Sequence, residues 1–182
     1  MSSPAHASAV STLVAWEPPA GDQQTLRNDF VRHLARHPDG ETRTCRPDHL
    51  TASLLVVSDD RRQVLLGLHA KVGRWLQFGG HIEPTDRSLP DAALREGVEE
   101  SGISSLLLAA DTPLRLDRHR APCGSGARHH LDVQFLATVD RATPATASPE
   151  SLEVRWFDVA AVPTDTDDAV RALVAAAVSA RG

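Results

Sequence analysis

Two apolar runs separated by four charged residues constrain the fold of this chain most. The first run covers Thr51 to Ser58, the second covers Gln63 to Leu68, and Asp59-Asp60-Arg61-Arg62 lies between them. Short aliphatic and β-branched runs on both sides of a polar turn are typical of a β-hairpin. The sequence therefore predicts an antiparallel pair of strands, whose apolar faces other elements must cover.

Three segments have apolar residues at helical spacing and can supply that cover: Asp22 to His37, Leu89 to Ser101, and Asp167 to about Ala180. The central one has Ser88 as a capping residue and ends at Gly102, as in a Schellman stop. Further strands are predicted at Pro113 to His119, His129 to Val139, and Leu152 to Phe157. Helices that flank partly hairpin-linked strands indicate an α/β fold of the α+β type with a mixed sheet.

The chain of 182 residues, 41% of them hydrophobic, has the size of one globular domain. We expect a flexible N-terminal tail over residues 1–21, which are rich in Ser, Ala and Pro. A helical extension over 22–48 and the main domain over 49–182 complete the expected organisation.

Composition excludes several classes of function. A net charge of -5 spread along the chain leaves no basic face for nucleic acid. There is no readable secretory signal and no run of about 18 apolar residues, so we expect a cytoplasmic protein without membrane contact. Cys45 and Cys123 indicate free thiols. The alternative is a zinc site, formed either by Cys45 with His49 or by Cys123 with His129 and His130. Neither spacing matches a standard zinc motif.

An acidic cluster carries the chemistry. Glu96, Glu99 and Glu100 stand at positions i, i+3 and i+4 of the central helix, so their carboxylates share one face. A solvated helix face is the ordinary interpretation of such a pattern. Here Gly79-Gly80 lies just upstream and permits close backbone approach to a ligand, and Mg²⁺ takes its ligands from carboxylates and substrate phosphates.

Gly80, Asp86 and the segment Arg95-Glu96-Gly97-Val98-Glu99-Glu100-Ser101-Gly102-Ile103 resemble the Nudix box of the MutT-like hydrolases. That resemblance implies a Nudix-like α/β/α sandwich. It also implies a pyrophosphatase that uses Mg²⁺, or Mn²⁺, to cleave the pyrophosphate bond of a nucleoside diphosphate linked to another moiety, such as a nucleotide or a sugar.

Residue roles follow from the same resemblance. Glu96, Glu99 and Glu100 are the implied metal ligands, together with the Gly80 carbonyl, and Arg95 is implied to hold the carboxylates by ion pairing. Glu150, six residues before Trp156, corresponds to a glutamate that joins the metal site or acts as a base in MutT-like members. A surface position ahead of a strand is the alternative for Glu150.

Two departures from the box bear on the site. Asp86 replaces a glutamate and is followed by eight residues before Arg95 instead of seven, which leaves its role open. Gly97 replaces a hydrophobic residue and weakens the helix by about 1 kcal/mol relative to alanine. We interpret Gly97 as a point of close packing against a neighbouring element.

Candidate substrate contacts lie on the strand from His129 to Val139. His130, Asp132 and Gln134 fall on one face of this strand and are predicted either to line a substrate pocket or to form the solvent face of the sheet. Arg118 is a candidate phosphate ligand, although surface arginines are common. Trp75 is a candidate for base stacking or, as the simpler interpretation, for the core.

Two other functions stay open. A Nudix-like domain without catalysis would serve as a ligand-binding or regulatory module, and its carboxylates would be expected to have decayed. An isoprenoid-diphosphate isomerase would need a catalytic cysteine, a role that neither Cys45 nor Cys123 is placed to fill. The expected partner is a small nucleoside-diphosphate-type substrate, and the resembled family also suggests a homodimer.

Overall fold

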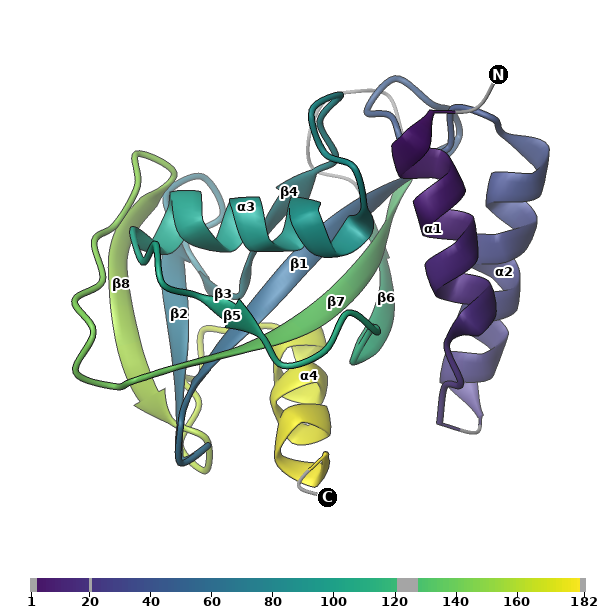
Figure 1. The fold of residues 1–182 in the computed structure, drawn as a ribbon. Coiled ribbons are helices and arrows are strands. Elements are labelled where there is room, and N and C mark those ends of the chain that lie inside the picture. Colours follow the sequence, from purple (N-terminus) through teal and green to yellow (C-terminus); the bar gives the residue numbers. More distant parts are fainter. Residues whose placement is uncertain (1–2, 20, 121–127, 181–182) are drawn as a thin grey trace.

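The computed structural model describes residues 3–19, 21–120 and 128–180. In this part of the chain eight strands form one sheet, flanked by helices on both faces (Figure 1). The helices are α1 Pro4–Ala15, α2 Asp22–Arg36, α3 Leu89–Ser101 and α4 Asp168–Ser179. The strands are β1 Asp48–Ser58, β2 Gln63–His69, β3 Trp75–Leu76, β4 Phe78–His81, β5 Leu107–Leu108, β6 Arg115–Arg120, β7 His129–Val139 and β8 Ser151–Asp158.

The sheet is mixed, as predicted. Strand β1 pairs with β7 in parallel over its whole length, from Asp48 opposite His129 to Ser58 opposite Val139. The other pairings are antiparallel: β1 with β2 and with β4, β2 with β3 and with β8, and β7 with β5 and with β6. Every residue of β1 is buried, because strands flank it on both edges and other elements cover both of its faces.

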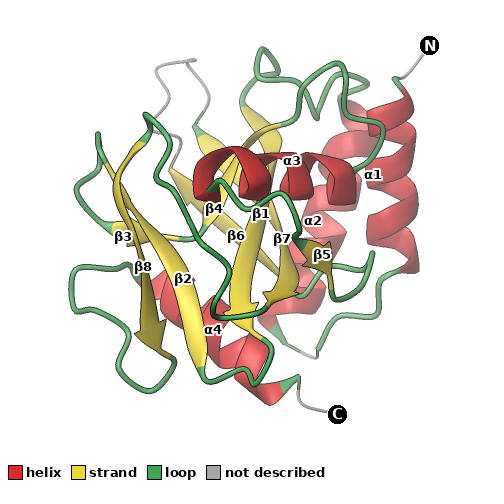
Figure 2. Ribbon diagram, turned by 60° about the vertical axis from the view of Figure 1, so that its left-hand side comes forward, coloured by secondary structure: helices red, strands yellow, loops and turns green. Residues whose placement is uncertain are grey.

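Figure 2 shows the layers of helices and sheet. Two clusters of apolar side chains hold these layers together. On one face, side chains of α1, α2 and α3 pack with Leu50, Ala52 and Leu54 of β1. On the other face, α4 packs against the alternate residues Leu55 and Val57. Among the described residues, no helix is long and apolar enough to cross a membrane.

The N-terminal segment differs from the expected flexible tail. Residues Pro4–Ala15 form α1, which starts with Ser3 as N-cap: its side chain accepts a hydrogen bond from the His6 backbone nitrogen. Ala5, Ala9 and Leu13 recur every four residues and are buried in the core. The expectation of little order rested on composition, whereas this spacing gives the segment an apolar side that packs on α2 and α3.

Candidate active site

Helix α3 has the bounds that its capping pattern predicts. The Ser88 hydroxyl accepts a hydrogen bond from the Asp91 backbone nitrogen at 3.1 Å, and Gly102 ends the helix in the left-handed conformation at φ 70°. Glu96, Glu99 and Glu100 occupy the last two turns. Their position close to β4 defines the candidate site.

The double glycine of β4 lies directly against these carboxylates. A Cβ atom on Gly80 would lie 2.6 Å from Oε1 of Glu96, so only glycine fits there without displacing the carboxylate. The Gly79 backbone nitrogen donates a hydrogen bond to Oε2 of Glu100 at 3.4 Å. The helix and the strand thus bring two carboxylates and a stretch of backbone together, as the sequence predicts.

Arg95 organises the loop between β4 and α3. Its guanidinium binds both carboxylate oxygens of Asp86, at 3.0 and 2.9 Å, and the carbonyl of His81 at 2.9 Å. It also contacts Glu96 at 3.0 Å and Glu99 at 3.3 Å. Asp86 has a structural part here, because it also accepts a hydrogen bond from the Glu83 backbone nitrogen. The shorter side chain and the extra loop residue still produce a two-pronged ion pair.

The electrostatics of the cluster favour a cation. Burial, followed by the charge of Glu96, raises the pKa of Glu100 to about 8. Burial also raises the pKa of Glu96, although Arg95 opposes that effect. Within the described residues, no arginine or lysine forms an ion pair with Glu100. Half-buried carboxylates that repel one another beside open backbone fit a hard divalent cation such as Mg²⁺.

Glu150 reaches the same region from the turn before β8. Its charge contributes to the raised pKa values of both Glu96 and Glu100, so its carboxylate lies near theirs. The backbone of Glu150 is anchored, because its carbonyl accepts a hydrogen bond from the Ala70 nitrogen at 2.9 Å. The side chain itself is exposed and can approach a ligand from the solvent side.

Gly97 packs closely against a neighbouring strand, as predicted. A Cβ atom at this position would lie 2.3 Å from Cδ2 of Leu54 and 3.3 Å from Cδ1 of Leu106. The missing side chain therefore seats α3 tightly on β1.

The polar row on β7 is buried inside the protein. Asp132 accepts hydrogen bonds from Thr51 and Ser53 of β1 and from Gln134, at 2.8 to 3.0 Å. Burial raises its pKa. Gln134 and His130 are also buried, so this side of the strand is not the solvent face that the sequence offered as an alternative.

This polar network faces away from α3. The β1 residues that bond Asp132 alternate with Leu50, Ala52 and Leu54, which face α3. No local pattern in the sequence marks Thr51 and Ser53 as partners of Asp132, because only the β1–β7 pairing brings them together. Arg115 of β6 joins the network through Gln134.

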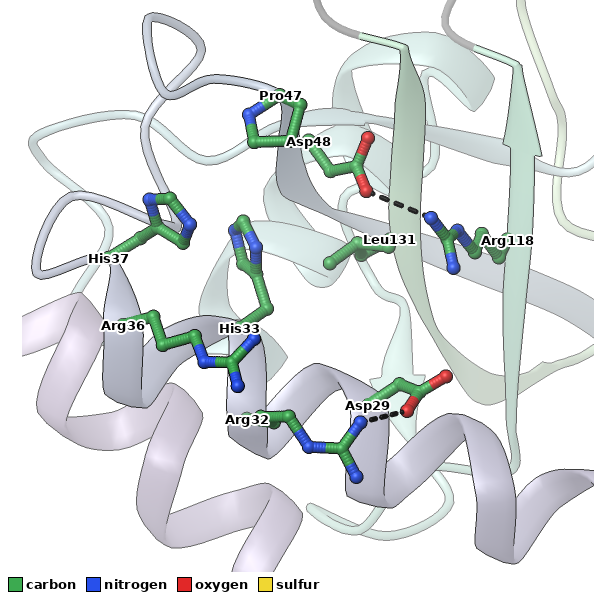
Figure 3. A pocket seen from close by; sticks show the side chains of 9 residues that line it. All are labelled: Asp29, Arg32, His33, Arg36, His37, Pro47, Asp48, Arg118 and Leu131. Atoms are coloured by element: carbon green, nitrogen blue, oxygen red, sulfur yellow. Dashed lines mark hydrogen bonds and ion pairs between the residues drawn. The ribbon is translucent and has the colours of Figure 1, made fainter.

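Arg118 lies apart from this row. It is paired with Leu131 across β6 and β7 and therefore points to the opposite face from His130, Asp132 and Gln134. Figure 3 shows it in a groove beside α2, where it binds Asp48 at 3.1 Å. The lining of that groove is Asp29, Arg32, His33, Arg36, His37, Pro47, Asp48, Arg118 and Leu131. The four predicted substrate contacts thus do not form one pocket.

Two other candidates have structural roles. Trp75 is buried and packs edge-on against Phe157 with 4.7 Å between ring centroids, which confirms the core interpretation. Cys45 is buried as well, and burial raises the pKa of its thiol to about 11, so the thiolate is disfavoured. Cys123 lies outside the described residues.

The chain is similar to known proteins in sequence and in fold. The NUDIX domain model matches residues 47–177. A NUDIX-family hydrolase from Clostridium perfringens has a similar structure, with a TM-score of 0.60 and 22% identity over 72% of this chain and 96% of that one. An Ap4A hydrolase from C. elegans gives a TM-score of 0.61 and 18% identity over 71% and 95%.

A third similar structure is the NUDIX domain of Shewanella oneidensis NrtR, complexed with ADP ribose. Its TM-score is 0.58, with 18% identity over 81% of this chain and 96% of that one. No curated protein sequence matches the chain. Since the family model spans well over half of its length, the chain belongs to the NUDIX domain family.

Proposed function

We propose that this Nudix protein is a Mg²⁺-dependent pyrophosphohydrolase that cleaves a nucleoside diphosphate linked to another moiety. One arrangement carries the proposal: Glu96 and Glu100 are held against Gly79-Gly80, and among the described residues Glu100 has no ion-pair partner. Its burial accordingly raises its pKa. A structural role would favour a paired carboxylate, because an unpaired buried charge destabilises the fold.

Some residues of the site would bind the metal ion directly, and another holds these ligands in position. Glu96, Glu99 and Glu100, with the Gly80 carbonyl, would hold Mg²⁺, and Mn²⁺ has the same preference for oxygen ligands. When bound, the ion would neutralise charge on the diphosphate and ease attack by water. Arg95 keeps Glu96 and Glu99 in position through the ion pairs described above.

For the proton of the attacking water we propose Glu150 as the acceptor. Its side chain is exposed and lies near Glu96 and Glu100, so it can face a substrate diphosphate without occupying the ion's place. Glu150→Gln should then lower kcat with little change in KM. An equal loss of Mg²⁺ affinity would assign Glu150 to the metal site instead.

Two of the similar structures guide the choice of substrate. One is an Ap4A hydrolase and another contains ADP ribose, and both compounds carry adenosine on a phosphate chain. We therefore propose an adenosine-containing diphosphate as the first class to test. Substrate contact by His130, Asp132, Gln134 and Arg118 stays a prediction, as does a homodimer.

The deciding experiment is a substrate panel with product analysis. Nucleoside triphosphates, nucleotide sugars, dinucleoside polyphosphates and coenzyme A are incubated with enzyme and Mg²⁺, and products are identified by mass spectrometry in isotopically labelled water. Release of a nucleoside monophosphate, lost in Glu100→Gln, is expected. Tight binding of a panel member without turnover would favour the ligand-binding alternative. An isomerised product would favour the isomerase, which the buried Cys45 thiol does not support.

A further inference from the structure

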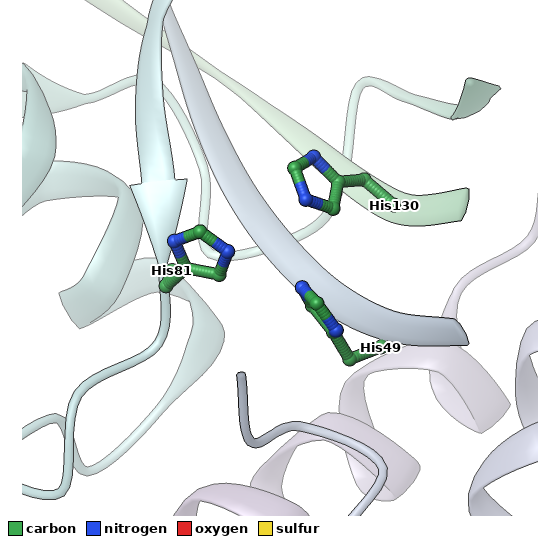
Figure 4. A group of neighbouring side chains, drawn as sticks. All are labelled: His49, His81 and His130. Atoms are coloured by element: carbon green, nitrogen blue, oxygen red, sulfur yellow. The ribbon is translucent and has the colours of Figure 1, made fainter. Parts of the chain in front are cut away.

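Three histidines from three different strands meet in one place (Figure 4). They lie on the face of the sheet opposite α3, because their neighbours Leu50 and Gly80 face that helix. His49 of β1 stands opposite His130 of β7 in the parallel ladder, and His81 ends the neighbouring strand β4. Their ring centroids lie 5.0 to 5.2 Å apart, and one nitrogen of each lies within 4.8 Å of the others. Side chains remote in sequence thus aim their polar atoms at one point.

The cluster is buried and its hydrogen bonding is incomplete. His49 has no solvent exposure and His130 is 8% exposed. Both ring nitrogens of His49, and Nε2 of His81, have no hydrogen-bond partner in the residues that the structure describes. The peptide group of Cys45 is close enough to influence the pKa of His49 but does not form a hydrogen bond of normal geometry with it. Buried polar atoms left this way destabilise a fold unless something binds them.

The chemistry of the three groups identifies what would bind. Neutral imidazoles offer lone pairs that suit zinc and similar transition ions, whereas Mg²⁺ prefers oxygen ligands. Burial lowers the pKa of His130 to about 3, which keeps this ring in the neutral form that ligates a metal. Zinc bonded at about 2.0–2.1 Å holds its nitrogens about 3.3 Å apart in a tetrahedron. The three nitrogens, which lie within 4.8 Å of one another, would have to approach by up to about 1.5 Å to reach that spacing.

We propose that His49, His81 and His130 form a binding site for a divalent transition ion of the zinc class, separate from the carboxylates on α3. Gly80 faces the carboxylate of Glu96, whereas its neighbour His81 faces the histidine cluster, so the sheet separates the two sites. Three protein ligands leave one tetrahedral position for water or for an exogenous ligand. Arg43 is the nearby positive charge that acts on all three histidines and opposes a cation there.

Binding is measured by titrating the chelator-treated full chain with ZnCl₂ while Mg²⁺ saturates the carboxylates. We expect one zinc per chain, and at least a tenfold loss of affinity in His49→Gln and in His130→Gln. His69→Gln is the matched control, because His69 lies on β2 outside the cluster, and it should bind as the wild type does. Arg43→Gln should bind more tightly. Glu100→Gln should retain zinc.

Loss of zinc in Glu100→Gln with retention in the histidine variants would overturn the proposal, since the ion would then sit at the carboxylates. If a histidine variant fails to fold, the site is tested on the wild-type protein. X-ray absorption at the zinc edge should show imidazole nitrogens at about 2.0–2.1 Å, with the outer-shell signals of the rings. A shell of oxygen alone, or no bound zinc, would equally refute the site.

Discussion

The substitution Glu100→Gln separates two effects of this buried carboxyl group, one on the stability of the fold and one on catalysis. With a pKa of about 8, the group is mostly protonated at pH 7 in the metal-free protein, whereas its ordinary value is 4.5. The folded state then binds more protons than the unfolded chain, so the free energy of unfolding falls as pH rises from about 4.5 to about 8. One pKa unit corresponds to about 1.4 kcal/mol, and partial contact with solvent reduces the total. Glu100→Gln should therefore stabilise the metal-free protein by roughly 1–3 kcal/mol at pH 7.

Activity should move in the opposite direction. Gln keeps the shape of Glu but contributes no charge to the ion, so we expect kcat to fall about 100-fold or more, equivalent to about 2.7 kcal/mol in the barrier. Mg²⁺ should raise the melting temperature of the wild type and have little effect on the variant.

The assay combines thermal melting at pH 5 and pH 8, with and without Mg²⁺, with kcat at saturating Mg²⁺. The stability difference should be small at pH 5 and largest at pH 8. Glu153→Gln is the matched control, because Glu153 is paired with Arg155 on β8, away from the carboxylates of α3. The reasoning fails if Glu100→Gln retains wild-type kcat, or if its stability gain is the same at both pH values.

Four further predictions test other parts of the site. Exhaustive chelation should abolish turnover, and Mg²⁺ or Mn²⁺ but not Ca²⁺ should restore it; full turnover without metal would contradict the carboxylate site. Gly97→Ala should cost about 1 kcal/mol in melting experiments, since overpacking against Leu54 exceeds the gain in helix propensity, and should become stabilising beside Leu54→Ala. Asp86→Asn should destabilise the fold by roughly 2–3 kcal/mol and lower kcat; unchanged melting would mean that its arginine pair is dispensable. Alanine at both Cys45 and Cys123 should leave turnover unchanged, and a folded but inactive variant would revive the isomerase hypothesis.

Local patterns predicted most of the elements and the centre of the site. The ends of α3 follow from Ser88 and Gly102, and the shared face of Glu96, Glu99 and Glu100 follows from helical geometry alone. The double glycine just upstream, which the family motif includes, also lies next to Glu96 in the fold. Helix α1 was not predicted, because the Ser-, Ala- and Pro-rich composition of residues 1–21 was given more weight than the four-residue spacing of Ala5, Ala9 and Leu13.

The remaining errors come from pairings between distant segments. Alternation placed His130 and Asp132 on one face of a strand, but only the registers with β1 and β6 show that this face is buried. The same registers place Arg118 on the other side and bring His49 next to His130. No local pattern marks His49 and His81 as neighbours, because β4 reaches β1 through a hairpin and a loop whose geometry depends on the whole sheet.

The long parallel ladder between β1 and β7 has a consequence for biosynthesis. Thr51 and Asp132 are hydrogen-bonded across 81 residues of chain, so an emerging polypeptide displays β1 long before its central partner has been made. During that interval one edge of this strand, which is buried along its whole length in the folded protein, has only water or another chain to bond. Such non-local pairing slows folding, because a long loop must close before its contacts form. Refolding yield should therefore decline with protein concentration, and a chain that stops before Val139 should aggregate where the full chain folds.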